Sequence, residues 1–193
     1  MTFRVAGVVL ALASAVLFGS MGWARSATPH PAVQHVVRTT HPSTAIRSTL
    51  DALAAFDECV RSVRRELPQS PLEGSQNLAQ LDVATGVATA DLAGCQNDQL
   101  AAVTGAVTAM RTTAPWDVVH AAAMAQADGQ QAGLVLGQMV LLLRHVSLVG
   151  GLDHLPAKTT GEWASEAAIY RGSIIRLGRR RRELRHVLAS TNA

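Results

Sequence analysis

Aromatic side chains are scarce in this chain: Phe, Tyr and Trp make up 4% of its 193 residues. Hydrophobic residues nevertheless reach 48%, and most of them are Ala, Val and Leu. Small side chains let helices approach each other closely, so this composition favours packed helices. The length suits one domain that builds its own core without a metal.

The short motifs that mark common catalytic sites are missing. The sequence contains no GxSxG, HExxH, GxxxxGK[ST] or GxGxxG pattern and no EF-hand spacing. These patterns supply nucleophiles, metal ligands and phosphate-binding loops. We therefore expect a non-enzymatic protein that acts by binding and has no cofactor.

Residues 1–26 have the pattern of an export signal. Arg4 precedes an uncharged apolar run from Val5 to Ala24, and small residues follow where a cleavage site would lie. The run also has the roughly 20 residues that a membrane span needs, so an uncleaved anchor formed by residues 5–24 is the alternative. No Cys follows the run, which argues against a lipoprotein anchor. We expect a periplasmic or extracellular protein.

Cysteine is limited to Cys59 and Cys95, with no CxxC or CxxCH motif. Redox catalysis and covalent haem attachment therefore have no support. In an exported chain an even count favours one disulfide, and two separate buried thiols are the alternative.

The spacing of the two cysteines makes an intrachain bridge demanding. In a simple hairpin turning near residues 68–72, the partner level with Cys59 would lie near residues 80–84. Cys95 is more than ten positions further, roughly 15–20 Å along a helix, whereas the Cα atoms of a disulfide lie about 4.4–6.8 Å apart. The bridge then requires a second helix that bends back, a longer disordered link before it or a non-adjacent arrangement. Intermolecular pairing is the alternative.

Residues 27–42 contain three Pro and three His without a helical period, which predicts a linker. Residues 43–193 form one predicted domain, an all-α antiparallel helical bundle, with four main helices as the favoured count. Helices are predicted from Ser43, Ser70, Pro115 and Thr159. Capping boxes start the second (Ser70 and Glu73) and the fourth (Thr159 and Glu162). Whether residues 71–112 form one helix or two stays open, because the polar residues 94–99 offer a break.

Apolar residues at three- and four-residue steps define the core face of each predicted helix. Residues 134–143 are apolar almost all round, as in a helix covered on every side. The predicted stripes are Ile46, Leu50, Leu53, Phe56, Val60, Val63 and Leu67; Leu78, Leu81, Thr85, Ala88, Leu92 and Cys95; Val118, Ala122, Ala125, Gly129, Ala132, Leu136, Met139, Leu143 and Val146; and Trp163, Ala167, Tyr170, Ile174, Leu177, Leu184 and Leu188.

Small residues recur every four positions in the third helix, at Ala121, Ala125, Gly129, Gly133 and Gly137. Such a ridge allows very close packing of another helix, which compensates for the cost of glycine in a helix. The ridge serves either internal packing, against the fourth or the second helix, or self-association with a partner. We favour internal packing.

Two acid-x-x-His steps resemble the ligand spacing of metal-binding bundles: Asp117 with His120, and Glu183 with His186. Neither pair joins a core stripe, so no metal site is predicted. His120 and Met124 are four residues apart and offer soft ligands for copper. A periplasmic small-ligand or copper-type binder is therefore our alternative function.

Arginine gathers near the C-terminus, where four of these residues are consecutive. Because successive helical residues are about 100° apart, the run surrounds the helix, and Arg181 falls on the core stripe. The arginines either complement the helix dipole at a solvated end or contact an envelope protein partner or an anionic lipid surface. Nucleic acid is an unlikely partner for an exported chain without interleaved aromatics. We predict an accessory or scaffolding subunit of a cell-envelope complex, with contact residues Arg176, Arg179, Arg180, Arg181, Arg182 and Arg185.

Overall fold

The computed structural model describes residues 41–151 and 158–191. The described residues all belong to the second of two units of the chain, Arg38–Ala193. The predicted export signal (1–26) and most of the predicted linker (27–42) lie outside them. The described residues contain helices and no strand, which confirms the all-α class. The helices are α1 (Pro42–Glu66), α2 (Pro71–Gly74), α3 (Leu78–Gly94), the π-helical turn η1 (Cys95–Gln99), α4 (Leu100–Met110), α5 (Trp116–Leu148) and α6 (Lys158–Thr191).

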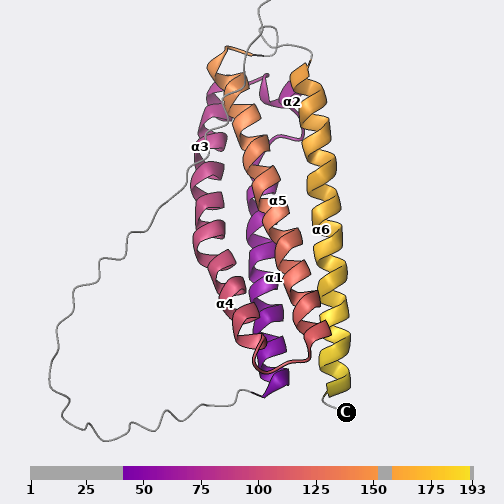
Figure 1. Cartoon of the computed structure of the whole chain (residues 1–193). Helices are drawn as coiled ribbons and strands as arrows, with labels where there is room; N and C mark the ends of the chain where they lie inside the picture. The colour runs from indigo at the N-terminus through magenta and orange to yellow at the C-terminus, as the bar shows by residue number, and fades with distance from the viewer. Residues whose placement is uncertain (1–40, 152–157, 192–193) are drawn as a thin grey trace, which may run out of the picture. The chain divides into compact units, whose positions relative to one another are not determined.

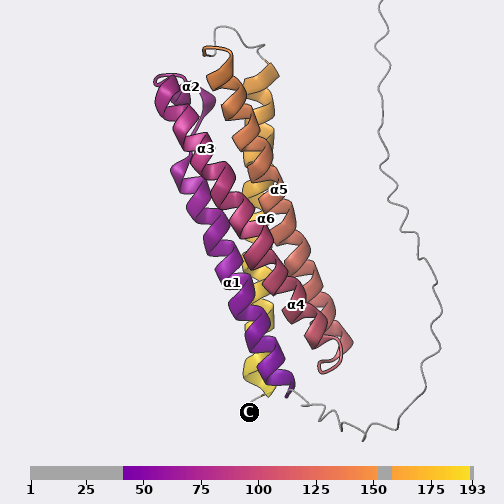
Figure 2. The same cartoon turned by 90° about the vertical axis from the view of Figure 1, so that its left-hand side faces the viewer.

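The long helices of the second unit lie lengthwise beside one another (Figures 1 and 2). Contacts between helices give their directions. Ser147 Oγ, at the end of α5, lies 3.5 Å from Oδ1 of Asp82, near the start of α3. These two helices are therefore antiparallel. Trp163 near the start of α6 donates a hydrogen bond to the carbonyl of Gln69, just beyond the end of α1, so these helices are antiparallel too. The most extensive packing is between α5 and α6.

The predicted core stripes are almost entirely buried and form one hydrophobic core. The three residues that stay half-buried are Leu78, Ala167 and Leu188. The burial follows from the period of each helix, which places these side chains on one face.

The prediction that residues 134–143 are covered on every side is wrong. Leu134, Leu141 and Leu148 on α5 are 62%, 65% and 72% exposed. Their seven-residue spacing keeps them on one face of the helix, opposite the buried stripe. By length and composition α5 is also the one helix of the described segments that could cross a membrane.

The second predicted helix is interrupted soon after it starts. Ser70 accepts a hydrogen bond from the Glu73 amide as predicted, but α2 ends after one turn. Asn77 caps a new start by accepting from the Gln80 amide at 3.1 Å. From Leu78 onwards no break occurs, because α3 continues through η1 into α4 without a capping side chain.

A disulfide joins Cys59 on α1 to Cys95 at the start of η1, with Cα atoms 5.8 Å apart. Cys59 lies seven residues before the end of α1, whereas Cys95 lies 17 residues after the start of α3. At about 1.5 Å per residue, α3 therefore starts well beyond the end of α1. The link of residues 67–77, which includes α2, spans that offset. The link is longer than a simple hairpin allows, so the simple hairpin is wrong. The predicted longer link is present, but it contains the helical turn α2 instead of being disordered.

Candidate functional site

The C-terminal arginines fall into three groups according to what they contact. Arg176 and Arg181 reach acidic residues on other helices, Arg179 and Arg180 share an acid on α6, and Arg182 and Arg185 face solvent. Arg176 Nε lies 2.7 Å from Asp128 Oδ1 on α5, and Arg176 also donates to the buried hydroxyl of Ser173. Arg176 therefore ties α6 to α5.

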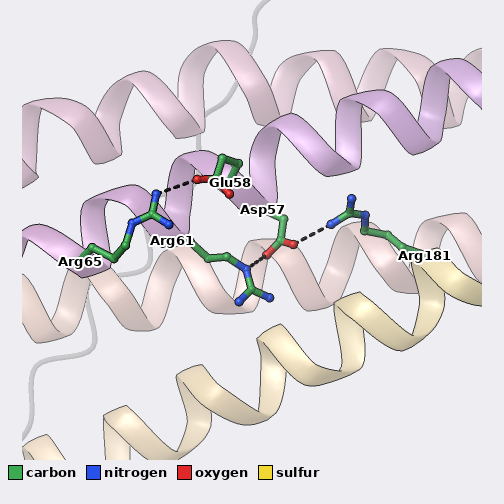
Figure 3. Close-up of polar contacts among 5 residues, drawn as sticks. All are labelled: Asp57, Glu58, Arg61, Arg65 and Arg181. Carbon is green, nitrogen blue, oxygen red and sulfur yellow. Dashed lines mark hydrogen bonds and ion pairs between the residues drawn. The ribbon is translucent and has the colours of Figure 1, made fainter.

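Arg181, which lies on the core stripe of α6, forms an ion pair with a buried acid of α1. Its Nη1 lies 2.6 Å from Asp57 Oδ2, and the other oxygen of the same carboxylate lies 2.7 Å from Arg61 Nε (Figure 3). The side chains of Arg181 and Asp57 are only 17% and 9% exposed. One buried carboxylate thus bridges a guanidinium of α1 and one of α6, because a buried charge needs a paired and hydrogen-bonded partner.

Glu183 is the acid that Arg179 and Arg180 share, at 3.8 and 3.1 Å. The three residues lie one turn apart on α6, where such pairs meet naturally. Glu183 therefore neutralises part of the run.

Arg182 and Arg185 are exposed, and neither has an ion pair or hydrogen bond with any described residue. They are three residues apart and so lie near each other on the helix surface. Of the six predicted contact residues, these two leave a full positive charge for a partner.

A second basic cluster, which the sequence analysis did not single out, lies between α1 and α6. Arg64, Arg65, Gln69, Ala167, Tyr170 and Arg171 line a hollow of about 230 Å³. The sequence signal is the pair Arg64–Arg65 one turn after Arg61, which by itself indicates only a solvated helix face. The meeting with Tyr170 and Arg171 depends on how the helices pack.

Burial shifts the pKa of two groups in this hollow. It lowers the pKa of the Arg64 guanidinium, and the charge of Arg171 adds to that effect. It raises the pKa of the Tyr170 phenol, against the opposing influence of nearby arginines on α1. Arg64 also lies over the ring of Trp163, 5.7 Å from its centre.

The small-residue ridge of α5 lies inside the core and receives side chains rather than a helix backbone. A Cβ atom added at Gly129 would lie 3.1 Å from the ring of Phe56 on α1. Gly133 faces the tip of the same ring, and Gly137 faces Leu92 on α3. Ala125 on the same ridge is fully buried. Leu177 on α6 also lies 3.9 Å from the Cβ position of Gly129, so the predicted internal packing against the fourth and second helices is confirmed, and the contact with α1 adds to it.

The weak copper alternative rests on exposed residues of α5. His120 stacks on the ring of Trp116, with centroids 4.9 Å apart, and Met124 is one turn further along the helix. The described residues contain no group of three His, Cys, Asp or Glu side chains that could hold a metal ion. No observation adds a third ligand to His120 and Met124.

Comparison with protein-family models, with curated proteins and with solved structures gives no match for this chain.

Proposed function

We propose that this chain is an exported, non-enzymatic helical protein that acts by binding, as an accessory or scaffolding subunit of a cell-envelope complex. The observation that carries the proposal is that Arg182 and Arg185 on α6 are both exposed. Neither forms an ion pair with any residue that the structure describes. The other arginines of the run have acidic partners within the chain. The partner we propose is an acidic protein surface.

Two further observations support this proposal. The Cys59–Cys95 disulfide fits an oxidising compartment outside the cytoplasm. Among the described residues that line four hollows, Ser62 and Tyr170 carry hydroxyl groups, and neither donates a hydrogen bond to an acid or a histidine of the described segments. This arrangement supports binding rather than group transfer.

Affinity purification of the tagged full chain from its native membranes tests the proposal. Replacing Arg182 and Arg185 by Gln should remove the co-purifying partner, and salt should elute the wild-type partner because exposed charges are screened. The matched control replaces Arg111 and Arg144, which are also exposed, by Gln. Retention of the same partners by both variants would refute the role of the arginines.

An anionic lipid surface is the competing partner. Sedimentation with phosphatidylglycerol vesicles, compared with neutral phosphatidylcholine vesicles, separates the two. Loss of vesicle binding in the Arg182/Arg185 variant, with no protein partner captured by the wild type, would assign the contact to lipid instead of protein.

A further inference from the structure

The hollow between α1 and α6 is lined by three arginines, Arg64, Arg65 and Arg171. Arg64 and Arg65 come from the last turn of α1, and Tyr170 and Arg171 come from the first half of α6. Figure 3 shows the same stretch of α1, where Arg61 and Arg65 lie one turn apart and point to different acids. The hollow is therefore built by side chains that the packing of two distant segments brings together.

The carboxylates of the described residues compensate this charge incompletely. Arg65 pairs with Glu58 at 2.6 Å. Arg64 has no carboxylate at ion-pair distance; its Nη1 donates instead to the carbonyls of Leu67 and Pro68 at the end of α1, both at 3.3 Å. Arg171 is exposed and has no ion pair within the described part of the chain. Two of the three guanidinium groups therefore lack an acidic partner.

Glu73 is a carboxylate whose charge acts on Arg64, and it already accepts a hydrogen bond. Its Oε2 accepts a hydrogen bond from the Gln69 amide at 2.5 Å, which holds it at the turn before α2. Burial lowers the pKa of Arg64; Tyr170 and Glu73 oppose this shift, and the charge of Arg171 adds to it. An anion lying between Arg64 and Arg171 would relieve both effects.

Tyr170 adds a neutral donor to this arrangement. Burial raises the pKa of its phenol, so the hydroxyl keeps its proton at neutral pH. Tyr170 lines the hollow together with Arg64 and Arg65. The charges of Arg61, Arg64 and Arg65 oppose the rise of its pKa, whereas that of Asp57 adds to it. A protonated hydroxyl beside guanidinium groups can donate a hydrogen bond to a bound anion.

We propose that this hollow binds an oxyanion of the phosphate type, with Arg64, Arg65 and Arg171 as charged donors and the Tyr170 hydroxyl as a fourth donor. Guanidinium groups match the oxygens of phosphate in geometry and charge. The volume of about 230 Å³ is below the roughly 300–1,000 Å³ of sites for drug-sized ligands, so it suits a small anion. This site goes beyond the proposed partner contact, which uses Arg182 and Arg185, about three helical turns further along α6.

Isothermal titration of the full chain with inorganic phosphate tests the site. The reference titration uses sodium chloride at the same ionic strength, so that screening is subtracted. We expect saturable binding by the wild type and a Kd at least about tenfold weaker in Arg171→Gln, because a charged hydrogen bond is lost. Tyr170→Phe should weaken binding less, since it removes a neutral donor.

Arg144→Gln is the matched control, because it removes one exposed arginine on α5 that does not line the hollow. Its Kd for phosphate should equal that of the wild type. Arg64 is left unchanged, because it caps α1 and its loss could unfold the chain. Equal melting temperatures of Arg171→Gln and the wild type without phosphate would exclude a folding defect. Absence of saturable binding, or equal weakening by Arg171→Gln and Arg144→Gln, would overturn the assignment.

The phosphate can be free or part of a lipid headgroup, and vesicles of phosphatidic acid in phosphatidylcholine distinguish these sources. Arg171-dependent sedimentation together with weak binding of inorganic phosphate assigns the site to a headgroup. Saturable binding of inorganic phosphate without sedimentation assigns it to free phosphate. This test is independent of the partner contact, because Arg171→Gln leaves Arg182 and Arg185 in place.

Discussion

Arg181 on α6 and Asp57 on α1 form an ion pair across the helix interface, with 2.6 Å between Nη1 and Oδ2, although 124 residues separate them in the sequence. Asp57 also holds Arg61, so its one carboxylate serves two guanidinium groups. Both partners are largely shielded from water. The pair therefore sets the position of α6 on α1.

Removing either partner of this pair should destabilise the fold. Loss of one member of a buried ion pair costs about 3–5 kcal/mol; because Arg181 keeps some exposure, we expect about 2–3 kcal/mol for Arg181→Gln. Asp57→Asn should cost more, since it deprives both Arg181 and Arg61 of their acid. Urea denaturation gives both values. The control is the exposed Arg182→Gln, which should change the free energy of unfolding by less than about 0.5 kcal/mol, and equal effects of Arg181→Gln and Arg182→Gln would contradict a structural role of the pair.

Gly129→Ala should destabilise the chain, although alanine favours helices. The added Cβ would lie 3.1 Å from the fully buried ring of Phe56, which has to move. Overpacking costs about 1–3 kcal/mol, whereas the gain in helix propensity is up to about 1 kcal/mol, so a net loss of about 1 kcal/mol is expected in thermal or urea denaturation.

Gly86→Ala is the matched control for that substitution, because nothing lies within 4 Å of the added Cβ. It should stabilise the chain by about 0.5–1 kcal/mol through helix propensity. If Gly129→Ala stabilised the chain as much as Gly86→Ala does, the close contact with Phe56 would be wrong.

The core was predictable from the sequence because burial in a helix follows a local period. Leu53, Leu136 and Leu177 belong to stripes read from spacing alone, and all three are fully buried. The start of α3 also has a local signal, because Asn77 is a capping residue directly before Leu78. The capping box of α2, a few residues earlier, predicts a helix start at Ser70 instead.

The contacts between helices were not predictable in the same way. A charge on the core stripe, such as that of Arg181, needs a partner when it is buried. Which acid of the chain supplies it cannot be read from the sequence until the offset between the helices is known. That offset depends on the link of residues 67–77, which is longer than the predicted turn near residues 68–72. The hollow beside Tyr170 has the same cause, because its residues come from helices far apart in the chain.

The Cys59–Cys95 disulfide should contribute about 4 kcal/mol to stability, from the loop-closure entropy of a cross-link between residues 36 positions apart. The double substitution of both cysteines by Ser tests this value by urea denaturation. Reducing and non-reducing gels of the wild type give the partner of each cysteine. A monomer whose mobility changes on reduction is expected, and a reducible dimer would contradict the intrachain bond.

Tyr170 should make the fold less stable as the pH rises into the alkaline range. Burial raises its pKa above the unfolded value of about 10, so above that pH the folded chain binds more protons than the unfolded chain and the free energy of unfolding falls. Tyr170→Phe should flatten this fall above about pH 10.

The titration of Tyr170 can be observed directly, because it is the chain's one tyrosine. Both cysteines are bonded, so their thiols do not titrate. Lys158 is the one lysine, and Lys158→Arg removes its titration from the same pH range as a matched control. The absorbance of the phenolate should appear at higher pH in the folded chain than in urea. Identical titration curves in the two states would show that the Tyr170 phenol is not buried between α1 and α6.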